Sequence, residues 1–396
     1  MARKKGAYGN GSIEPSGKNS WRVRYRIDGV RYAKIVEGTK TEAGKELRRL
    51  LHAGDEGKHV APDKMTVDAW IDHWIRIGAP GRRKKKVGRR TLEGYGQKLR
   101  THVKPVLGKK VLQELQAIDI DKLYAGFEGK MSETTAHHVH TVFNSCLSAA
   151  VRKKLLARNP IGDAERIPAA GEFDHDVLDD AELARLVAGF KGSPLYPIVA
   201  VAAFTGARLR EVIALMWDDI DFENRIITVS RAVEETKGYR GTKRPKTERG
   251  IRTFKIDDNL AKMLAAHREK QQRLVAGLPD GIEVDLSLIR LPAGALLFPG
   301  GDGTYLTKLR DARAVSRTFK RRVLKLGFSA ALRLHDLRGS HETVLLDGGV
   351  SVHVVAERCG HDPAILLRNY AKRTKKADAA AADVIGTVSA SALSQK

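Results

Sequence analysis

Residues 332–370 read LRLHDLRGSHETVLLDGGVSVHVVAERCGHDPAILLRNY and predict three consecutive helices. Apolar residues recur at helical spacing, and Gly348-Gly349 and Gly360 stand where the first two helices should end. Asp362-Pro363 is a typical start for the third. We therefore expect a helical region whose last helix carries Tyr370.

The polar residues of this stretch have different expected surroundings. His335 and Arg338 lie three residues apart and should share a helix face that points away from the core. His341 falls in the apolar stripe with Leu337, which favours a packed histidine over a catalytic one. Cys359 is expected to be a small buried hydrophobe.

Upstream, AFTGARLREVIALMWDDIDF at 203–222 predicts another helix. Its apolar face should carry Leu209, Val212, Ile213 and Met216. Arg208 and Glu211 share a different face. An arginine just after a tight glycine turn is well placed to meet a phosphate, and Glu211 is placed to hold it. A surface ion pair would give the same pattern, so this stretch alone leaves both interpretations open.

His361 and Tyr370 complete the set. His361 should lie at an exposed corner, and Tyr370 follows nine residues later. Two arginines, two histidines and a tyrosine in ordered motifs supply phosphate-binding charge and groups for proton transfer. In order and spacing, TGARLRE, HDLR, CGH and Tyr370 resemble the boxes of the tyrosine recombinase (phage integrase) family. Cys359 stands where that family usually has leucine, a change of packing.

The resemblance implies a role for each matching residue. Arg208 and Arg338 would clamp the scissile phosphate, and His335 and His361 would donate hydrogen bonds to it. A hairpin lysine would protonate the leaving 5′-oxygen, and RPKTERGIRTFKI supplies Lys246, with Lys243 as the alternative. Glu211 would support the site structurally. The implied catalytic residues are Arg208, Lys246, His335, Arg338, His361 and Tyr370.

The implied reaction is attack by Tyr370 on a DNA phosphodiester, which gives a 3′-phosphotyrosine and a free 5′-hydroxyl. The 5′-hydroxyl of a partner strand then reverses this attack. Because the phosphotyrosine stores the bond energy, the resemblance implies neither a metal nor ATP, and no GxxxxGK[ST] loop is present. It implies a site-specific recombinase that integrates or excises a phage or mobile element. The implied partners are double-stranded DNA attachment sites, a homotetramer formed on DNA, and candidate DNA-bending accessory proteins.

Residues 1–58 predict a small sheet packed on one helix. Apolar residues alternate with arginines, the period of a strand with one apolar face: Trp21, Val23, Tyr25 and Ile27 against Arg22, Arg24 and Arg26. Asp28-Gly29 marks a hairpin turn, and Thr39 with Glu42 forms a capping box. The arginine face fits either a DNA groove or plain solvent. By resemblance, this segment is an arm-site-binding domain.

Residues 64–165 predict a helical domain that resembles the core-binding (SAM-like) domain of the family. Helices are expected at 67–74, 91–103, 119–127 and 132–155, before an Asn159-Pro160 break. A basic run is expected to contact phosphates without reading sequence: Arg82, Arg83, Lys84 and Lys85. Three histidines are expected on a polar helix surface rather than in a metal site: His137, His138 and His140.

The remaining residues, 174–396, predict the catalytic domain. The expected fold class is α+β, mainly α, with a sheet-plus-helix N-terminal domain, a helical second domain, and a mostly helical third domain that has a small antiparallel sheet. The stretch from Gly281 to Ala293 is expected to be a surface insertion.

Composition agrees with a polyanionic partner. The 396 residues carry a formal net charge of +24, which favours nucleic acid. With only two cysteines, no secretory signal and no long apolar run, the sequence predicts a soluble cytoplasmic protein, not a membrane protein.

Two alternatives stay open at this point. A type IB topoisomerase shares the phosphotyrosine chemistry but relaxes supercoils instead of exchanging strands. An inactive DNA-binding regulator descended from the family would keep the fold without the reaction.

Overall fold

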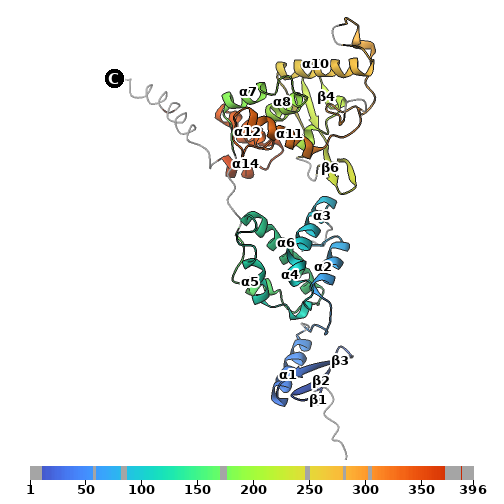
Figure 1. Cartoon of the computed structure of the whole chain (residues 1–396), viewed down its shortest axis with the longest axis vertical. Helices are drawn as coiled ribbons and strands as arrows, with labels where there is room; N and C mark the ends of the chain where they lie inside the picture. Colours follow the sequence, from blue (N-terminus) through green and yellow to red (C-terminus); the bar gives the residue numbers. More distant parts are fainter. Residues whose placement is uncertain are drawn as a thin grey trace, which may run out of the picture. The chain divides into compact units, whose positions relative to one another are not determined.

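The computed structural model describes residues 11–56, 59–81, 87–169, 176–245, 250–279, 282–301, 306–370 and 385. The chain divides into two compact units, residues 1–173 and 174–396 (Figure 1). The first unit contains two separate hydrophobic cores, one in its sheet and one in its helices. The mainly α fold with small antiparallel sheets confirms the expected fold class.

The N-terminal sheet is antiparallel, in the order β1-β2-β3, and packs on one helix. Its elements are β1 (Ser12–Gly17), β2 (Ser20–Ile27), β3 (Val30–Glu37) and α1 (Lys40–Asp55). Val23 and Tyr25 are buried under α1, while the three arginines of β2 are exposed, as their alternation predicts. Asp28 and Gly29 both have positive φ, at 50° and 78°, which suits a tight hairpin.

Strand β1 was not expected. Its sequence, SIEPSG, contains a proline and lacks a clear alternation, and its pairing with β2 shifts register between Pro15 and Gly17. The predicted capping box of α1 is present, with the Thr39 side chain accepting from Glu42 N and Glu42 accepting from Thr39 N.

The helical part of the first unit has its own core, which contains the fully buried Trp70, Trp74 and Phe143. Its elements are α2 (Val67–Arg76), α3 (Arg89–Lys98), a π-helical turn (Leu99–Val103), α4 (Lys104–Leu107), α5 (Ala117–Ala125) and α6 (Glu133–Arg152), with 3-10 turns at Leu112–Glu114 and Pro160–Asp163. Trp70 Nε1 donates to Cys146 O at 3.0 Å, which ties α2 to α6.

The basic run and the histidines predicted for this part have different outcomes. The basic run at 82–86 lies outside the described residues. His138 is exposed, but His140 is only 9 % exposed and its Nδ1 lies 2.9 Å from the Tyr124 hydroxyl. The prediction of a polar surface was therefore wrong for His140, because the tyrosine gives the buried ring a hydrogen-bond partner.

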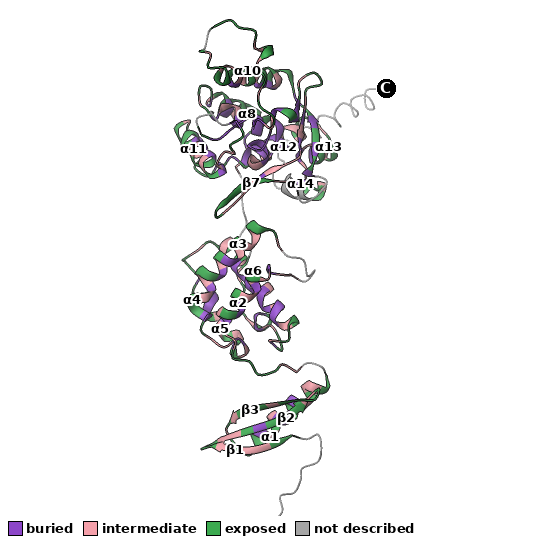
Figure 2. Cartoon of the chain, turned by 90° about the vertical axis from the view of Figure 1, so that its right-hand side faces the viewer, coloured by how far each residue is buried: buried purple, intermediate pink, exposed green. Residues whose placement is uncertain are grey.

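The second unit is built around α8, which is apolar on every side and buried (Figure 2). Helices α7, α10 and α12 pack against it. The helices are α7 (Asp180–Ala188), α8 (Tyr196–Thr205), α9 (Leu209–Val212), α10 (Asp258–Val275), α11 (Ala312–Lys325), α12 (Asp336–Asp347), α13 (Val352–Cys359) and α14 (Pro363–Tyr370), with 3-10 turns at Trp217–Asp219 and Leu286–Leu288.

Two small antiparallel sheets complete this unit. The sheet β4-β5-β8 is formed by β4 (Ile220–Asp221), β5 (Ile226–Val229) and β8 (Arg252–Lys255), and the hairpin by β6 (Ala232–Thr236) and β7 (Tyr239–Lys243). The helix expected after Thr205 is shorter than predicted, because α9 spans only four residues and the chain turns toward β4. Of the predicted apolar face, Val212 and Ile213 are buried, while Leu209 and Met216 are only partly buried. Ile213 is buried from a turn rather than from a helix.

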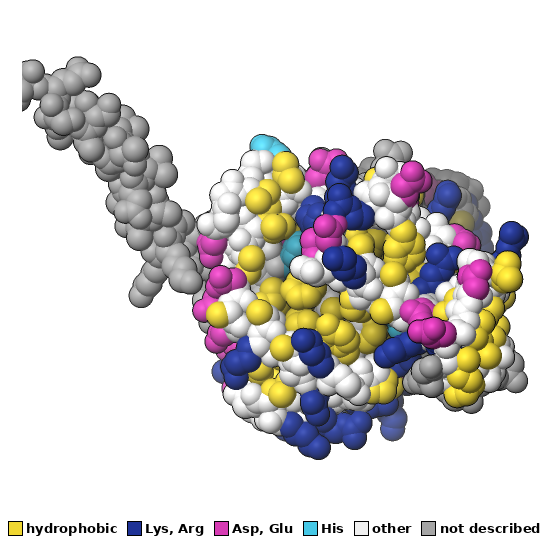
Figure 3. All heavy atoms as spheres, turned by 90° about the horizontal axis from the view of Figure 1, so that it is seen from above, with side chains coloured by type: hydrophobic (Ala, Val, Ile, Leu, Met, Phe, Trp, Pro, Cys, Tyr) yellow, Lys and Arg dark blue, Asp and Glu magenta, His cyan; other side chains and the backbone are white. Residues whose placement is uncertain are grey.

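The described part of the predicted insertion has no strand and only a short 3-10 turn. Leu288 within it is 83 % exposed, and Leu274 at the end of α10 is 53 % exposed. On the face drawn in Figure 3, hydrophobic side chains lie among Lys, Arg, Asp and Glu. Among the described residues, no helix has the length and apolar character needed to span a membrane.

Candidate active site

The turn that leads into Arg208 is determined by close packing. Gly206 has φ 64°, and a Cβ there would lie 2.7 Å from the His341 ring and 2.9 Å from Cys359 Sγ. Thr205 donates its hydroxyl to Val201 O at 2.6 Å and accepts from Ala207 N at 3.2 Å. The Thr-Gly pair thus ends α8 and reverses the chain so that Arg208 becomes the N-cap of α9.

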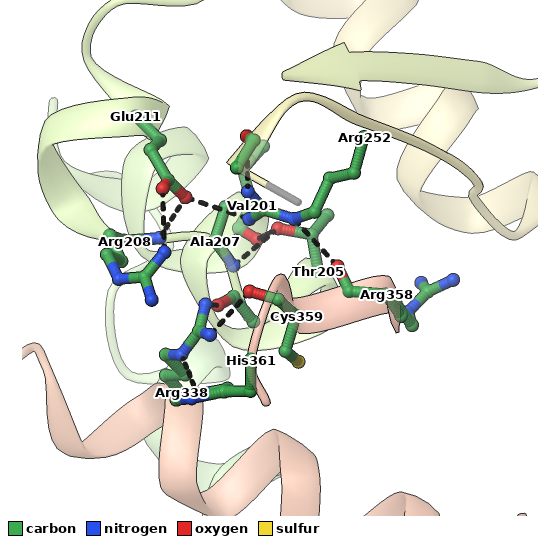
Figure 4. A network of polar contacts seen from close by, with 12 residues as sticks. Val201, Thr205, Ala207, Arg208, Glu211, Arg252, Arg338, Arg358, Cys359 and His361 are labelled. Carbon is green, nitrogen blue, oxygen red and sulfur yellow. Dashed lines mark hydrogen bonds and ion pairs between the residues drawn. The ribbon is translucent and has the colours of Figure 1, made fainter. Parts of the chain in front are cut away.

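Glu211 is the centre of a buried ion network (Figure 4). Its carboxylate accepts from Arg208 N at 2.9 Å, from Arg208 Nη1 at 3.0 Å and from Arg252 Nη2 at 2.8 Å. Burial alone would raise the pKa of Glu211, but the hydrogen bond and charge of Arg252, with help from Arg208, lower it. The carboxylate therefore stays ionised and holds Arg208 in place.

Arg252 is a member of this network that the sequence analysis missed. It is 6 % exposed, and Nε donates to Arg358 O at 2.8 Å. A signal was available, because in β8 the buried positions alternate, and Arg252 shares its face with Phe254 while Thr253 and Lys255 are exposed. An arginine on the apolar face of a strand indicates a buried acidic partner.

Arg338 is buried, which corrects the expectation that it faces away from the core. It is 3 % exposed; Nη1 donates to Gly206 O at 2.8 Å and Nη2 to Cys359 O. These carbonyls end α8 and α13, so each lacks a partner within its own helix and accepts from the guanidinium instead. Burial lowers the pKa of Arg338 to about 10, so it remains charged at neutral pH.

The two predicted histidines lie around Arg338. His335 is the N-cap of α12 and is exposed, although desolvation of its ring lowers its pKa and the charges of Arg338 and Arg208 add to that effect. His361 is less exposed than the expected corner position, at 16 % for the side chain, because its Nε2 lies 2.8 Å from Arg338 Nε. Arg208, His335, Arg338 and His361 are therefore brought together.

His341 is a packed histidine, as predicted. It is 7 % exposed, and its Nε2 accepts from Arg358 Nε at 3.3 Å. Burial, followed by the charge of Arg358, lowers the pKa of His341 to about 4. Cys359 is likewise fully buried, and burial raises the pKa of its thiol to about 12.

Glu342 is the second acidic residue that the sequence analysis missed. It is 7 % exposed, and Oε1 lies 2.8 Å from His361 Nε2 and 3.2 Å from Arg338 Nε. Its place in the sequence gave a signal, because it follows Arg338 by four residues and therefore shares a helix face with it.

Three predicted residues remain outside this geometry. Lys246 and the side chain of Tyr370 lie outside the described residues, although the Tyr370 backbone ends α14, the helix predicted to carry it. The alternative lysine, Lys243, lies on β7 and pairs with Glu234 of the same hairpin.

The predicted DNA-binding arginines of β2 lie in the N-terminal sheet. Arg22, Arg24 and Arg26 are exposed on one side of the strand, and Arg24 Nη1 donates to Glu14 Oε1 at 3.2 Å. The geometry therefore contains two kinds of positive charge: an exposed row on a sheet, and a buried group of arginines with histidines. The second kind can bind and polarise a phosphate diester and can supply protons to it.

Comparison with known sequences gives a family and several relatives. The sequence model of the phage integrase family matches residues 177–377. An integrase of Streptomyces ambofaciens is 26% identical over 362 residues, which cover 90% of this chain and 85% of that protein. A XerC-like tyrosine recombinase of Caldanaerobacter subterraneus is 26% identical over 89% of this chain and 92% of its own length. The integrase of Mycobacterium phage D29 is 25% identical over 93% of this chain.

Solved structures share the fold. The Tn1549 transposon integrase, in complex with a circular intermediate DNA, has a TM-score of 0.63 at 19% identity and covers 81% of this chain and 99% of that one. A lambda integrase dimer bound to a core site has a TM-score of 0.56 at 16% identity, over 95% of this chain and 97% of that one.

Proposed function

The chain belongs to the phage integrase family and is a tyrosine-type site-specific DNA recombinase, and we propose that it uses Tyr370 to integrate or excise a phage or mobile element. The observation that carries the residue assignment is the convergence of Arg208, His335, Arg338 and His361, from motifs far apart in the sequence, around one buried guanidinium. A phosphate diester is the substrate that such a group fits.

In this proposal the two arginines bind the scissile phosphate differently. Arg338 donates one hydrogen from Nη1 and one from Nη2 to backbone carbonyls, so one hydrogen on each nitrogen remains for two phosphate oxygens. Arg208 is more open, with 39% of its side chain exposed, and is held by Glu211. One fixed and one accessible guanidinium suit the charge that develops on the phosphate oxygens as the tyrosine attacks.

The other proposed groups donate hydrogen bonds or protons to the reacting oxygens. His335 and His361 donate hydrogen bonds to the phosphate, and Lys246 of the segment after β7 protonates the leaving 5′-oxygen.

Attack by the Tyr370 oxygen forms the 3′-phosphotyrosine bond and breaks the P–O5′ bond. A 5′-hydroxyl of the partner strand then attacks the same phosphorus and releases Tyr370. The number of phosphodiester bonds is unchanged, so the scheme needs no ATP or metal.

The partner in this proposal is double-stranded DNA, which the net charge of +24 favours. Arg22, Arg24 and Arg26 contact one DNA segment from the N-terminal sheet, and residues 82–85 contact phosphates from the helical domain. Exchange of strands between two duplexes requires four cleaving subunits, so we propose a homotetramer on DNA. The similar lambda integrase has been solved as a tetramer bound to a Holliday junction, at a TM-score of 0.53.

Strand exchange tests this function. Pairs of labelled duplexes of different length, tiled from DNA that flanks the gene, are incubated with the protein and separated by size. The proposal expects recombinant lengths from one pair of tiles. Relaxation of supercoiled DNA without recombinant products would instead indicate the topoisomerase reaction, and binding without either product would indicate a DNA-binding regulator.

A further inference from the structure

Glu342 is a buried carboxylate for which the reaction above has no use. Its helix, α12, places it one turn beyond Arg338, where only 9% of its side chain is exposed. Burying a carboxylate costs several kcal/mol unless positive or proton-donating groups compensate for it. The groups that meet it are Arg338 and His361, which the proposed function assigns to the phosphate.

Two neighbours of His361 Nε2 favour opposite forms of that nitrogen. Nε2 lies 2.8 Å from Arg338 Nε and 2.8 Å from Glu342 Oε1. An unprotonated Nε2 would accept from Arg338, but its lone pair would then face the carboxylate at that short distance. A protonated Nε2 is instead attracted to Glu342, and Arg338 Nε–H meets the same oxygen at 3.2 Å. Only a protonated Nε2 gives this carboxylate oxygen a donor, because Glu342 Oε1 otherwise has no hydrogen-bond partner among the described residues. In that form the hydrogen bond from Arg338 Nε to Nε2 is lost.

We propose that Glu342 is a positioning residue: its carboxylate accepts from Nε2–H of His361, turns that edge of the imidazole inward, and leaves Nδ1 to face the scissile phosphate. The scissile phosphate in this inference rests on the proposed function, whereas the contact between Glu342 and His361 does not. Among the described residues, no hydrogen-bond partner is recorded for His361 Nδ1.

The electrostatics of the site support this role. Burial alone would raise the pKa of Glu342, but the hydrogen bond from His361 and the charge of Arg338 outweigh it and lower the pKa, so the carboxylate is ionised at neutral pH. Cys359 of α13 and His341 of α12 are further titratable neighbours of Glu342, and Arg208 and Arg252 act on Arg338. Glu342 is thus an ionised carboxylate that lies 2.8 Å from His361 Nε2.

The same arrangement is known to matter in other enzymes. A carboxylate that holds a histidine fixes its tautomer and orientation and stabilises its charged form. Loss of such an outer partner lowers activity by about 10- to 100-fold in metal sites, where it orients the histidine in the same way. We expect an effect of that size on cleavage and little effect on DNA affinity, because Glu342 itself does not touch the DNA.

The experiment measures single-turnover cleavage of a nicked substrate, with the covalent protein–DNA complex as product, across pH. E342Q keeps the shape and removes the charge, E342D keeps the charge, and E357Q removes an exposed acid from α13 as a control. E342Q should cleave about 10- to 100-fold more slowly with DNA affinity unchanged. The pH dependence of its rate should also change, because an ionised carboxylate beside Arg338 and His361 is replaced by a neutral amide. E342D should recover part of the rate, and E357Q should match the wild type.

A double mutant separates this role from a merely structural one. If Glu342 acts through His361, then E342Q adds no further loss to the loss caused by H361Q. The proposal would be overturned if E342Q lowered the cleavage rate by the same factor in the H361Q background as in the wild type. An E342Q rate and pH profile like those of the wild type would also overturn it. If E342Q proves unstable to heat, E342D provides the comparison, because an intact charge at a slightly shorter reach should retain part of the rate.

One readout does not depend on cleavage. In protein labelled with ¹⁵N-histidine, the His361 signal is the one missing from H361Q, and it should show a protonated Nε2 that changes in E342Q. A His361 signal that is the same in both would overturn the proposal. If the wild type forms no covalent complex, the proposed function fails, while this signal still decides the role of Glu342.

Discussion

The N-terminal sheet and the proposed catalytic centre both concentrate arginines, but in opposite surroundings. On β2, Arg22, Arg24 and Arg26 are exposed, and the Arg24–Glu14 pair leaves 51% and 43% of the two side chains open to water. At the catalytic centre, Arg252 and Glu211 pair with only 4% and 6% exposed. The first kind of charge is available to a partner at little folding cost, and the second is part of the fold.

This difference has energetic consequences. Water screens an exposed pair, so it contributes about 0–1 kcal/mol. A buried charge that loses its partner cannot be solvated, and the cost is about 3–5 kcal/mol. Arg252 and Arg338 are therefore held in place by the fold itself, and such preorganised charge is what the proposed stabilisation of a transition state requires.

The largest expected effect comes from Glu211→Gln. It leaves Arg252 buried without its acidic partner, so the free energy of unfolding of the second unit should fall by about 3–5 kcal/mol. Hydrogen exchange followed by mass spectrometry, which resolves the units, measures it. Glu14→Gln, which breaks the exposed pair, is the matched control and should change stability by at most about 1 kcal/mol. Similar losses from the two variants would refute the contrast.

The next effect concerns pH. The pKa of His341 is about 4 in the folded chain, against an ordinary 6.5. Between these values the unfolded chain binds more protons than the folded one, so stability is complete above pH 6.5 and is lost as the pH falls. The loss should reach roughly 2–3 kcal/mol at pH 4.

Unfolding measured across this pH window checks the expectation. His341→Gln should flatten the pH dependence of the second unit, while His353→Gln, at an exposed position of α13, should leave it unchanged. The expectation fails if the slope survives in His341→Gln.

The smallest effect on stability is expected at the exposed arginines. Replacing Arg22, Arg24 and Arg26 together by glutamine should alter the free energy of unfolding by no more than about 0.5 kcal/mol per site. It should reduce the slope of log affinity for DNA against log salt by about 0.9 for each phosphate contact that is lost. Filter binding at several salt concentrations measures the slope, and an unchanged slope would mean that this face does not meet DNA.

The sequence predicted some charged sites better than others. On β2 the apolar face is formed by neighbouring residues, so a period of two was enough to show which side the arginines take. Arg252 follows the same period in β8, yet its partner, Glu211, is 41 residues away, and the position of Arg338 depends on a carbonyl 132 residues away. Local patterns do not contain such pairings, so the burial of Arg338 was visible only in the tertiary structure. The pairing of Glu342 with Arg338 is different, because these two residues lie one helical turn apart and their spacing gave a signal for it.

The same reasoning explains the errors in the elements. The residues after Arg208 have helical periodicity, but α9 ends at Val212 because the chain enters a sheet whose partner strand, β8, lies further along the sequence. Strand β1 has no pattern of its own and exists because β2 offers it a free edge. In both cases a contact distant in sequence decided the outcome.

Covalent trapping tests the central claim, that Tyr370 is the nucleophile, most directly. Nicked suicide substrates tiled from DNA that flanks the gene are incubated with the wild type and with Tyr370→Phe and are separated on a denaturing gel. The account predicts a shifted covalent band at one tile for the wild type, and no such band for Tyr370→Phe with DNA binding intact. A band that persists in Tyr370→Phe, or binding without any covalent band in the wild type, would contradict it.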